Sequence, residues 1–259
     1  MMTTVSKREK EQRRKLQHFL ADLALLGSLQ GFKYFQPWLR GKEELLLTVV
    51  NEDLKLLVTA RQPKMMPSSF LRTFYFVLRE PSSEEHLLPA SPSEREMAVP
   101  EVNCTLFLLA GYMKYGRPHA WIRSNHERLV SIRGTDSMVR DTPLKLKSIT
   151  DWQAGGIRVW DVVSELVSLC TVPFPSNPFA LDMRYIQSLP VSERFLATGA
   201  LLNFLETYAV CGNRDELHYE KVLEEVKPLR RLHVQTLLEL QRLKKTSAEQ
   251  DVDIAECVS

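Results

Sequence analysis

The first stretch of the chain has the apolar spacing of a helix that buries one face. Residues 6–29 contain few helix breakers, and their apolar positions recur every three or four residues, at Leu16, Phe19, Leu20, Leu23 and Leu26. This spacing predicts an amphipathic helix that docks through these side chains. Its first half is basic and includes Lys7, Arg8, Arg13 and Arg14. Because a helix start favours acidic side chains, the basic cluster indicates a frayed end or a binding partner.

The pattern then changes to that of β-strands. Residues 32–35 form a short aromatic run that stops at Pro37, and two β-rich runs, residues 45–50 and 54–58, flank an Asn/Asp loop. Two such runs around a short polar loop are typical of a β-hairpin. A further aromatic and β-branched run, residues 70–78, predicts another strand of the same antiparallel sheet.

More structure is predicted beyond residue 100. Residues 104–112 are mostly apolar and predict a compact helix that ends near Gly116. Residues 120–123 and 129–133 flank a polar stretch and predict a second hairpin. The sheet is therefore expected to continue across residues 80–100, whose richness in proline, serine and glutamate predicts a disordered insert.

The second half of the chain has the apolar spacing of helices. Residues 157–170, 191–211 and 215–245 each predict one helix, the last with a kink at Pro228. One side of this last helix is apolar, with Val222, Val226, Leu229, Leu232, Leu237, Leu240 and Leu243. The other side is basic, with Lys227, Arg230, Arg231, Arg242, Lys244 and Lys245. The apolar stripe is expected to pack on the body of the protein or on a partner.

Together these segments predict an α+β fold with an amino-terminal helix, an antiparallel sheet built from hairpins and a helical carboxy-terminal half. The expected organisation is a helix plus antiparallel sheet in residues 1–79, a disordered insert in 80–100, the continuation of the α+β domain in 101–172, a helical region in 173–245 and a disordered acidic tail in 246–259.

Composition excludes a strong overall electrostatic attraction to any partner. The 34 basic and 32 acidic residues leave a net charge of +2, so no global field draws the protein to nucleic acid or to an anionic membrane. The sequence has no apolar leader and no apolar run long enough to span a membrane, which predicts an intracellular protein, nuclear or cytoplasmic and not secreted. The four cysteines are widely spread, as is typical of free thiols.

The common motifs of catalysis and metal binding are missing from the sequence. The ten glycines form neither the P-loop nor the dinucleotide-binding pattern. The six histidines and four cysteines form no HExxH or CxxC spacing, and no GxSxG nucleophile motif occurs. No cofactor and no metal ion are therefore predicted.

These observations favour a non-catalytic protein-interaction or scaffold subunit of an intracellular multiprotein complex. The candidate contacts come from the last helix, from a tryptophan beside an arginine, and from the basic start of the first helix. The predicted partner-binding residues are Leu237, Leu240, Leu243, Arg231, Trp121, Lys7, Arg8, Arg13 and Arg14.

Two other classes of function stay open. A nucleic-acid-associated nuclear factor is one, because the basic residues of the first and last helices could neutralise phosphates. The near-zero net charge counts against it, as does the lack of alternating aromatic and basic residues along any one predicted strand. An enzyme whose site is assembled in space from distant residues is the other, since such a site leaves no sequence motif.

Overall fold

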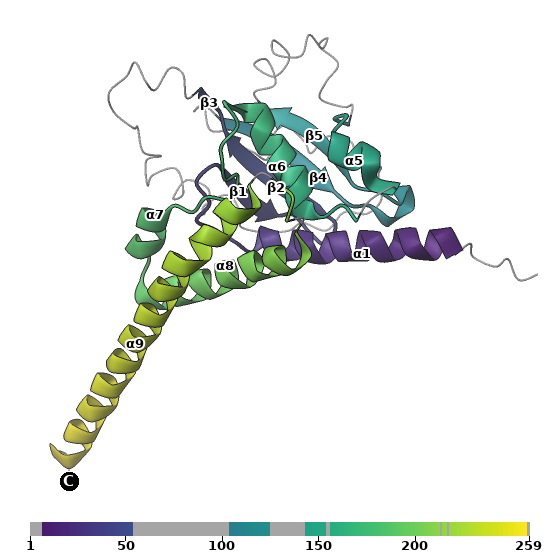
Figure 1. Ribbon diagram of the computed structural model, residues 1–259. Helices are drawn as coiled ribbons and strands as arrows, with labels where there is room; N and C mark the ends of the chain where they lie inside the picture. Colours follow the sequence, from purple (N-terminus) through teal and green to yellow (C-terminus); the bar gives the residue numbers. More distant parts are fainter. Residues whose placement is uncertain are drawn as a thin grey trace, which may run out of the picture.

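A computed structural model describes residues 7–53, 104–124, 143–153, 156–212, 214–216 and 218–257. The main sheet has four strands, and Figure 1 shows helices packed against it and a long last helix that projects away from the rest. The predicted α+β fold is confirmed, with an amino-terminal helix, an antiparallel sheet and a helical carboxy-terminal half.

The described elements begin with a helix and continue with strands and then helices, with the short strand β6 between α6 and α7. The helices are α1 (Lys7–Gly27), α5 (Lys147–Thr150), α6 (Val159–Cys170), α7 (Met183–Ser188), α8 (Val191–Cys211) and α9 (Tyr219–Cys257), with 3-10 turns at Met113–Tyr115 and Asp151–Gln153. The strands are β1 (Phe35–Leu39), β2 (Glu44–Val50), β3 (Glu52–Asp53), β4 (Cys104–Ala110), β5 (His119–Ser124) and β6 (Thr171–Val172).

The sheet is antiparallel, with the strand order β1-β2-β4-β5. β1 and β2 form a hairpin in which Phe35 pairs with Val49 and Leu39 pairs with Leu45. Gly41 in the connecting turn has a φ of 77°, in the left-handed region that glycine enters without steric cost. β3 and β6 form a separate short parallel pair.

This hairpin differs from the predicted one. β2 pairs with β1 on one side and with β4 on the other, so the predicted pairing of residues 45–50 with residues 54–58 is wrong. Pro37 lies inside β1 rather than ending a strand, because β1 is an edge strand of the described sheet, where a missing N–H donor is tolerated.

Several predicted segments lie outside the described residues. They are residues 54–58, 70–78, 80–100 and 129–133. The strands and the disordered insert predicted there stay predictions.

Residues 104–110 form the central strand β4, and the predicted helix is wrong. Every residue of β4 is buried, because the strand has β2 and β5 on its two sides and apolar side chains on both faces of the sheet. A strand buried on both faces is continuously apolar. It therefore lacks the alternation that distinguishes a strand from a buried helix in sequence.

Helix α1 docks through the face that the sequence predicts. Leu16, Phe19, Leu23 and Leu26 are fully buried, and Leu20 is half-buried at the margin of this face. They join a single core that includes inward side chains of the sheet and of α6, α8 and α9.

A buried ion pair on α1 was not predicted. Asp22 is almost fully buried, and its carboxylate accepts two hydrogen bonds from the guanidinium of Arg158, which precedes α6. The distance from Arg158 Nη2 to Asp22 Oδ1 is 2.7 Å. Arg158 also lies over the ring of Trp160, 4.4 Å from its centroid. The pair therefore ties α1 to the start of α6.

Aromatic rings join the sheet to the carboxy-terminal helices. Phe32 stacks on Phe35 of β1 with ring centroids 4.4 Å apart, and it lies 5.7 Å from Phe204 of α8. Phe179 lies 5.9 Å from Phe35 and 5.7 Å from Phe204. On the other side of this cluster, Tyr208 of α8 lies 5.7 Å from Trp160 of α6.

The long helix α9 extends further than the sequence indicates. It passes through Pro228, and its backbone is helical up to Cys257, whereas the sequence analysis expects a disordered tail from residue 246. Residues 246–257 contain no proline or glycine and include Ala248, Glu249 and Gln250, all of favourable helix propensity. The acidic composition alone suggested a tail, but nothing in it interrupts a helix.

We expect Asp22→Ala to destabilise the fold by about 3 kcal/mol, because it leaves a largely buried guanidinium without its carboxylate. Chemical denaturation followed by circular dichroism measures the loss. Glu11→Ala is the matched control: it breaks the exposed Glu11–Arg14 pair on the same helix, which should cost less than about 1 kcal/mol. Equal losses in both variants would contradict a structural role for the Asp22–Arg158 pair.

Candidate protein-interaction surface

Helices α8 and α9 pack against each other in antiparallel orientation. Tyr219 at the start of α9 donates its hydroxyl to the carbonyl of Ala209, near the end of α8, at 2.9 Å. Further along, Thr198 Oγ1 and His233 Nδ1 are 2.8 Å apart, and the His233 ring stacks on Phe195 at 4.7 Å. These contacts hold α9 at a defined rotation about its own axis.

That rotation decides which side of α9 faces solvent. Val222, Leu229 and Thr236 are buried against the body. The opposite side carries three exposed apolar side chains, which we call the outer patch: Val234 (49% exposed), Leu237 (37%) and Leu238 (49%). Positions 234, 237 and 238 are neighbours on a helix, so the three form one continuous surface.

Basic side chains lie on both sides of the outer patch along the helix. The exposed residues before it are Lys227, Arg230 and Arg231, and those after it are Arg242, Lys244 and Lys245. Arg230 Nη2 donates to Glu206 of α8 at 3.0 Å. An apolar centre between two cationic ends is the main surface feature of the described part of α9.

The predicted stripe residues divide between two sides of α9. Leu237 belongs to the outer patch, and Arg231 lies next to it on the same side. Leu240 is half-buried and continues the side that packs on α8, as does Leu243, which is 52% exposed. Val234 and Leu238 were not predicted, although two consecutive leucines, Leu237 and Leu238, already made the apolar surface wider than one stripe.

The other predicted partner-binding residues lie elsewhere. Lys7, Arg13 and Arg14 are exposed on α1, at the opposite end of the molecule from the tip of α9 (Figure 1), and the side chain of Arg8 is not described. Trp121 on β5 is 7% exposed, so its ring is not the exposed anchor that the sequence analysis expects. The structure does not bring together the basic residues of α1, Trp121 and the outer patch of α9.

Strand β5 carries an aromatic and basic alternation that the sequence analysis missed. His119, Trp121 and Arg123 alternate along the strand on the face opposite to Ala120 and Ile122, which join the main core. The rings of His119 and Trp121 stack at 5.6 Å, and the Arg123 guanidinium lies 5.7 Å from the Trp121 ring. Burial and the nearby Arg117 lower the pKa of His119.

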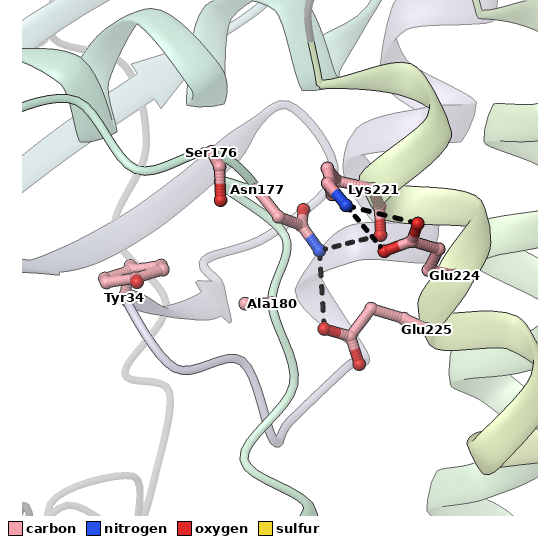
Figure 2. Close-up of a pocket in the computed structure, with 7 residues that line it drawn as sticks. All are labelled: Tyr34, Ser176, Asn177, Ala180, Lys221, Glu224 and Glu225. Carbon is pink, nitrogen blue, oxygen red and sulfur yellow. Dashed lines mark hydrogen bonds and ion pairs between the residues drawn. The ribbon is translucent and has the colours of Figure 1, made fainter.

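A polar hollow of about 300 Å³ lies between Tyr34, which precedes β1, the segment before α7, and α9 (Figure 2). Asn177 spans it: the side-chain nitrogen donates to Lys221 O at 3.3 Å and to Glu225 Oε1 at 3.5 Å. Lys221 Nζ in turn donates to Glu224 Oε2 at 3.0 Å. Burial raises the pKa of Glu225. The hydrogen bonds among Asn177, Lys221, Glu224 and Glu225 therefore join the segment before α7 to the start of α9.

A cluster of titratable groups surrounds the start of α6. Asp161 Oδ2 accepts the backbone N–H of Arg158 at 2.7 Å and so caps the helix. Glu216, in the α8–α9 connection, accepts the hydroxyl of Tyr208 at 3.2 Å and lies 3.1 Å from His218 Nε2. Burial, and to a lesser degree Glu216, raises the pKa of Asp161 from 3.8 to about 6, although the Arg158 N–H favours its charged form.

Neither a metal site nor a membrane span emerges from the described part of the chain. Among those residues, no three His, Cys, Asp or Glu side chains gather closely enough to hold a metal ion. None of the described helices combines the length and apolarity needed to cross a bilayer.

The fold and the surface define an α+β protein with a projecting amphipathic helix. A comparison with known families shows to which family the chain belongs. Residues 91–235, more than half of the chain, match the family described as "Domain of unknown function (DUF7886)", and the chain belongs to this family. The match starts before β4 and ends within α9, so α1, β1 and β2 precede it. No curated protein and no solved structure matches the chain.

The Asp161 cluster should make stability depend on pH. Folding raises the pKa of Asp161 from 3.8 to about 6. The stabilisation that protonated Asp161 gives to the fold is therefore fully present below about pH 4 and is lost as the pH rises through about 6. Relative to Asp161→Asn, the unmodified protein should therefore lose roughly 1–3 kcal/mol of unfolding free energy between pH 4 and 7, at about 1.4 kcal/mol per pKa unit.

Urea denaturation across this pH range measures the difference. Asp151→Asn, which changes an exposed carboxylate, is the matched control and should run parallel to the unmodified protein. A difference between the unmodified protein and Asp161→Asn that is flat with pH would contradict the raised pKa.

Proposed function

We propose that this protein is a non-catalytic interaction subunit of an intracellular multiprotein complex, nuclear or cytoplasmic, and that it binds a protein partner through the outer patch of α9. The observation that carries the proposal is the exposure of Val234, Leu237 and Leu238 side by side on a helix that projects from the body (Figure 1). Contiguous exposed apolar side chains with a polar rim are typical of binding sites.

The flanking charges specify the chemistry of the partner. Three exposed basic residues precede the patch and three follow it. A complementary partner presents apolar side chains, flanked by acidic residues, from an amphipathic helix. The apolar anchors would supply most of the affinity, whereas the basic flanks would set orientation and association rate.

The enzyme alternative has less support from the described residues than the interaction role. In the polar hollow of Figure 2, the Asn177 side chain is hydrogen-bonded to Lys221 and Glu225, and the titratable groups around Asp161 serve as a helix cap and as hydrogen-bond partners of one another. Those arrangements favour structural roles.

Nucleic-acid binding is a second candidate, favoured by one specific observation. On β5, His119, Trp121 and Arg123 alternate on one face, and Tyr115 beside them is 43% exposed with Lys114 over its ring at 4.8 Å. An exposed ring beside a cation, such as that of Tyr115, stacks on unpaired bases. If this surface binds single-stranded RNA, affinity in a fluorescence anisotropy titration should fall steeply with salt, and Tyr115→Ala should weaken it by about 1–3 kcal/mol.

For the protein-partner proposal, we expect Leu238→Glu to weaken binding at least about 30-fold, which is the effect of losing an interface anchor worth about 2 kcal/mol. The measurement is the recovery of stoichiometric copurifying proteins with the tagged full-length protein, after nuclease treatment. Circular dichroism should be unchanged, because Leu238 does not pack in the core.

Val210→Glu is the matched control, since Val210 is an even more exposed valine on α8, 84% exposed and outside the patch. It should leave the partner bound. Retention of the partner by Leu238→Glu, or loss of the partner in both variants, would contradict an interface at the outer patch.

A further inference from the structure

The side of α9 that packs on α8 has a regular spacing that continues past α8. Its positions alternate by three and four residues, which is the heptad spacing of helices that pair along one side. In the described body these positions are Tyr219, Val222, Val226, Leu229, His233, Thr236, Leu240 and Leu243.

Helix α8 covers only part of this series. Arg194, close to the first residue of α8, donates to Glu239 Oε2 at 2.6 Å, so the two helices separate just beyond that point of α9. Figure 1 shows α9 continuing alone past α8. Leu243 is accordingly 52% exposed. Counted along the helical backbone, the same spacing reaches positions 247, 250, 254 and 257, which are Ser247, Gln250, Ile254 and Cys257.

We propose that two copies of this chain pair antiparallel through residues 240–257 of α9. This surface lies on the side of the helix opposite to the outer patch, so the proposal is independent of the partner argued above. It commits to a second copy because the segment is complementary to itself in both its apolar positions and its charges.

The apolar complementarity depends on the register, which decides which residues of the two copies lie opposite each other. In an antiparallel pair centred between positions 247 and 250, Leu243 of one copy lies opposite Ile254 of the other, and Leu240 lies opposite Cys257. The polar residues Ser247 and Gln250 then meet each other at the centre. Each of these opposed pairs combines the first heptad position of one copy with the fourth heptad position of the other, as antiparallel two-helix pairing requires.

The charge complementarity selects the same direction. The segment begins basic, with Arg242, Lys244 and Lys245, and ends acidic, with Glu249, Asp251, Asp253 and Glu256. Antiparallel pairing brings the basic part of each copy to the acidic part of the other, and places Lys244 beside Asp251 at the flanking positions. Parallel pairing would place like charges together.

The proposed pairing also leaves room for the body of each copy. At about 1.5 Å per residue, residues 240–257 span about 27 Å, and antiparallel pairing puts the two bodies at the opposite ends of this length. The pairing surface is short and has a polar centre. A monomer–dimer equilibrium that depends on concentration is therefore the expected behaviour.

Sedimentation equilibrium of the full-length protein tests the association. The mass should rise from 29.9 kDa toward twice that value with concentration. Leu243→Glu should weaken dimerisation at least about tenfold, whereas Leu238→Glu, on the outer patch, should leave it unchanged. Lys244→Glu and Asp251→Lys should each weaken it, and the double variant should restore it. A monomer at every concentration, or no restoration by the double variant, would overturn the proposal.

A disulfide trap tests the register. In a Cys211→Ser background, Leu240→Cys should form a cross-linked dimer with Cys257 of the other copy when diamide is the oxidant, because opposed core positions are within disulfide reach. The added change Cys257→Ser should abolish that dimer. Cross-linking through Cys257 alone, without the new cysteine, would mean parallel pairing and would overturn the antiparallel assignment, as would the absence of a cross-link in the Leu240→Cys protein.

Discussion

The packing of Phe32, Phe179 and Phe204 against one another holds the sheet to the helical half of the molecule. Phe32 belongs to the segment between α1 and β1, Phe179 to the segment before α7, and Phe204 to α8, so the contact gathers parts that are far apart in the chain. Two backbone hydrogen bonds of 2.8 Å support it, from Lys33 N to Ala180 O and from Asp182 N to Gly31 O. Since α9 takes its direction from α8, the position of the outer patch depends on this aromatic packing.

The sequence predicts those elements whose pattern comes from one buried side. α8 has the predicted bounds, and α1 buries the predicted leucines, because each helix has a core side and a solvent side. β4 was misassigned because a strand buried on both faces has no periodic signal. The predicted hairpin was wrong for a different reason: strand pairing depends on which edges are occupied, and β4, far along the chain, occupies one edge of β2.

The candidate surface was only partly predictable for the same kind of reason. Sequence periodicity shows that α9 is amphipathic, but its rotation against α8 is decided by tertiary contacts such as that between Thr198 and His233. Of the predicted partner-binding residues on α9, Leu237 and Arg231 lie on the exposed side, while Leu240 and Leu243 lie on the other, and their role in binding stays a prediction. Asp22 and Arg158 are 136 positions apart in the sequence, and neither residue has a local pattern that would reveal the pair.

The outer patch contributes little to the stability of the body, and that is the reason to propose it as a binding surface. An apolar side chain contributes to folding through the area that it removes from water, so Val234 and Leu238, each about half exposed, contribute little on the isolated chain. Scattered exposed leucines are ordinary on protein surfaces. One valine and two leucines side by side, on a projecting helix with cationic ends, form a surface that another molecule can desolvate as a unit. The geometry of α9 thus separates its core side, which is used within the chain, from an exposed apolar side, which we propose as the binding surface.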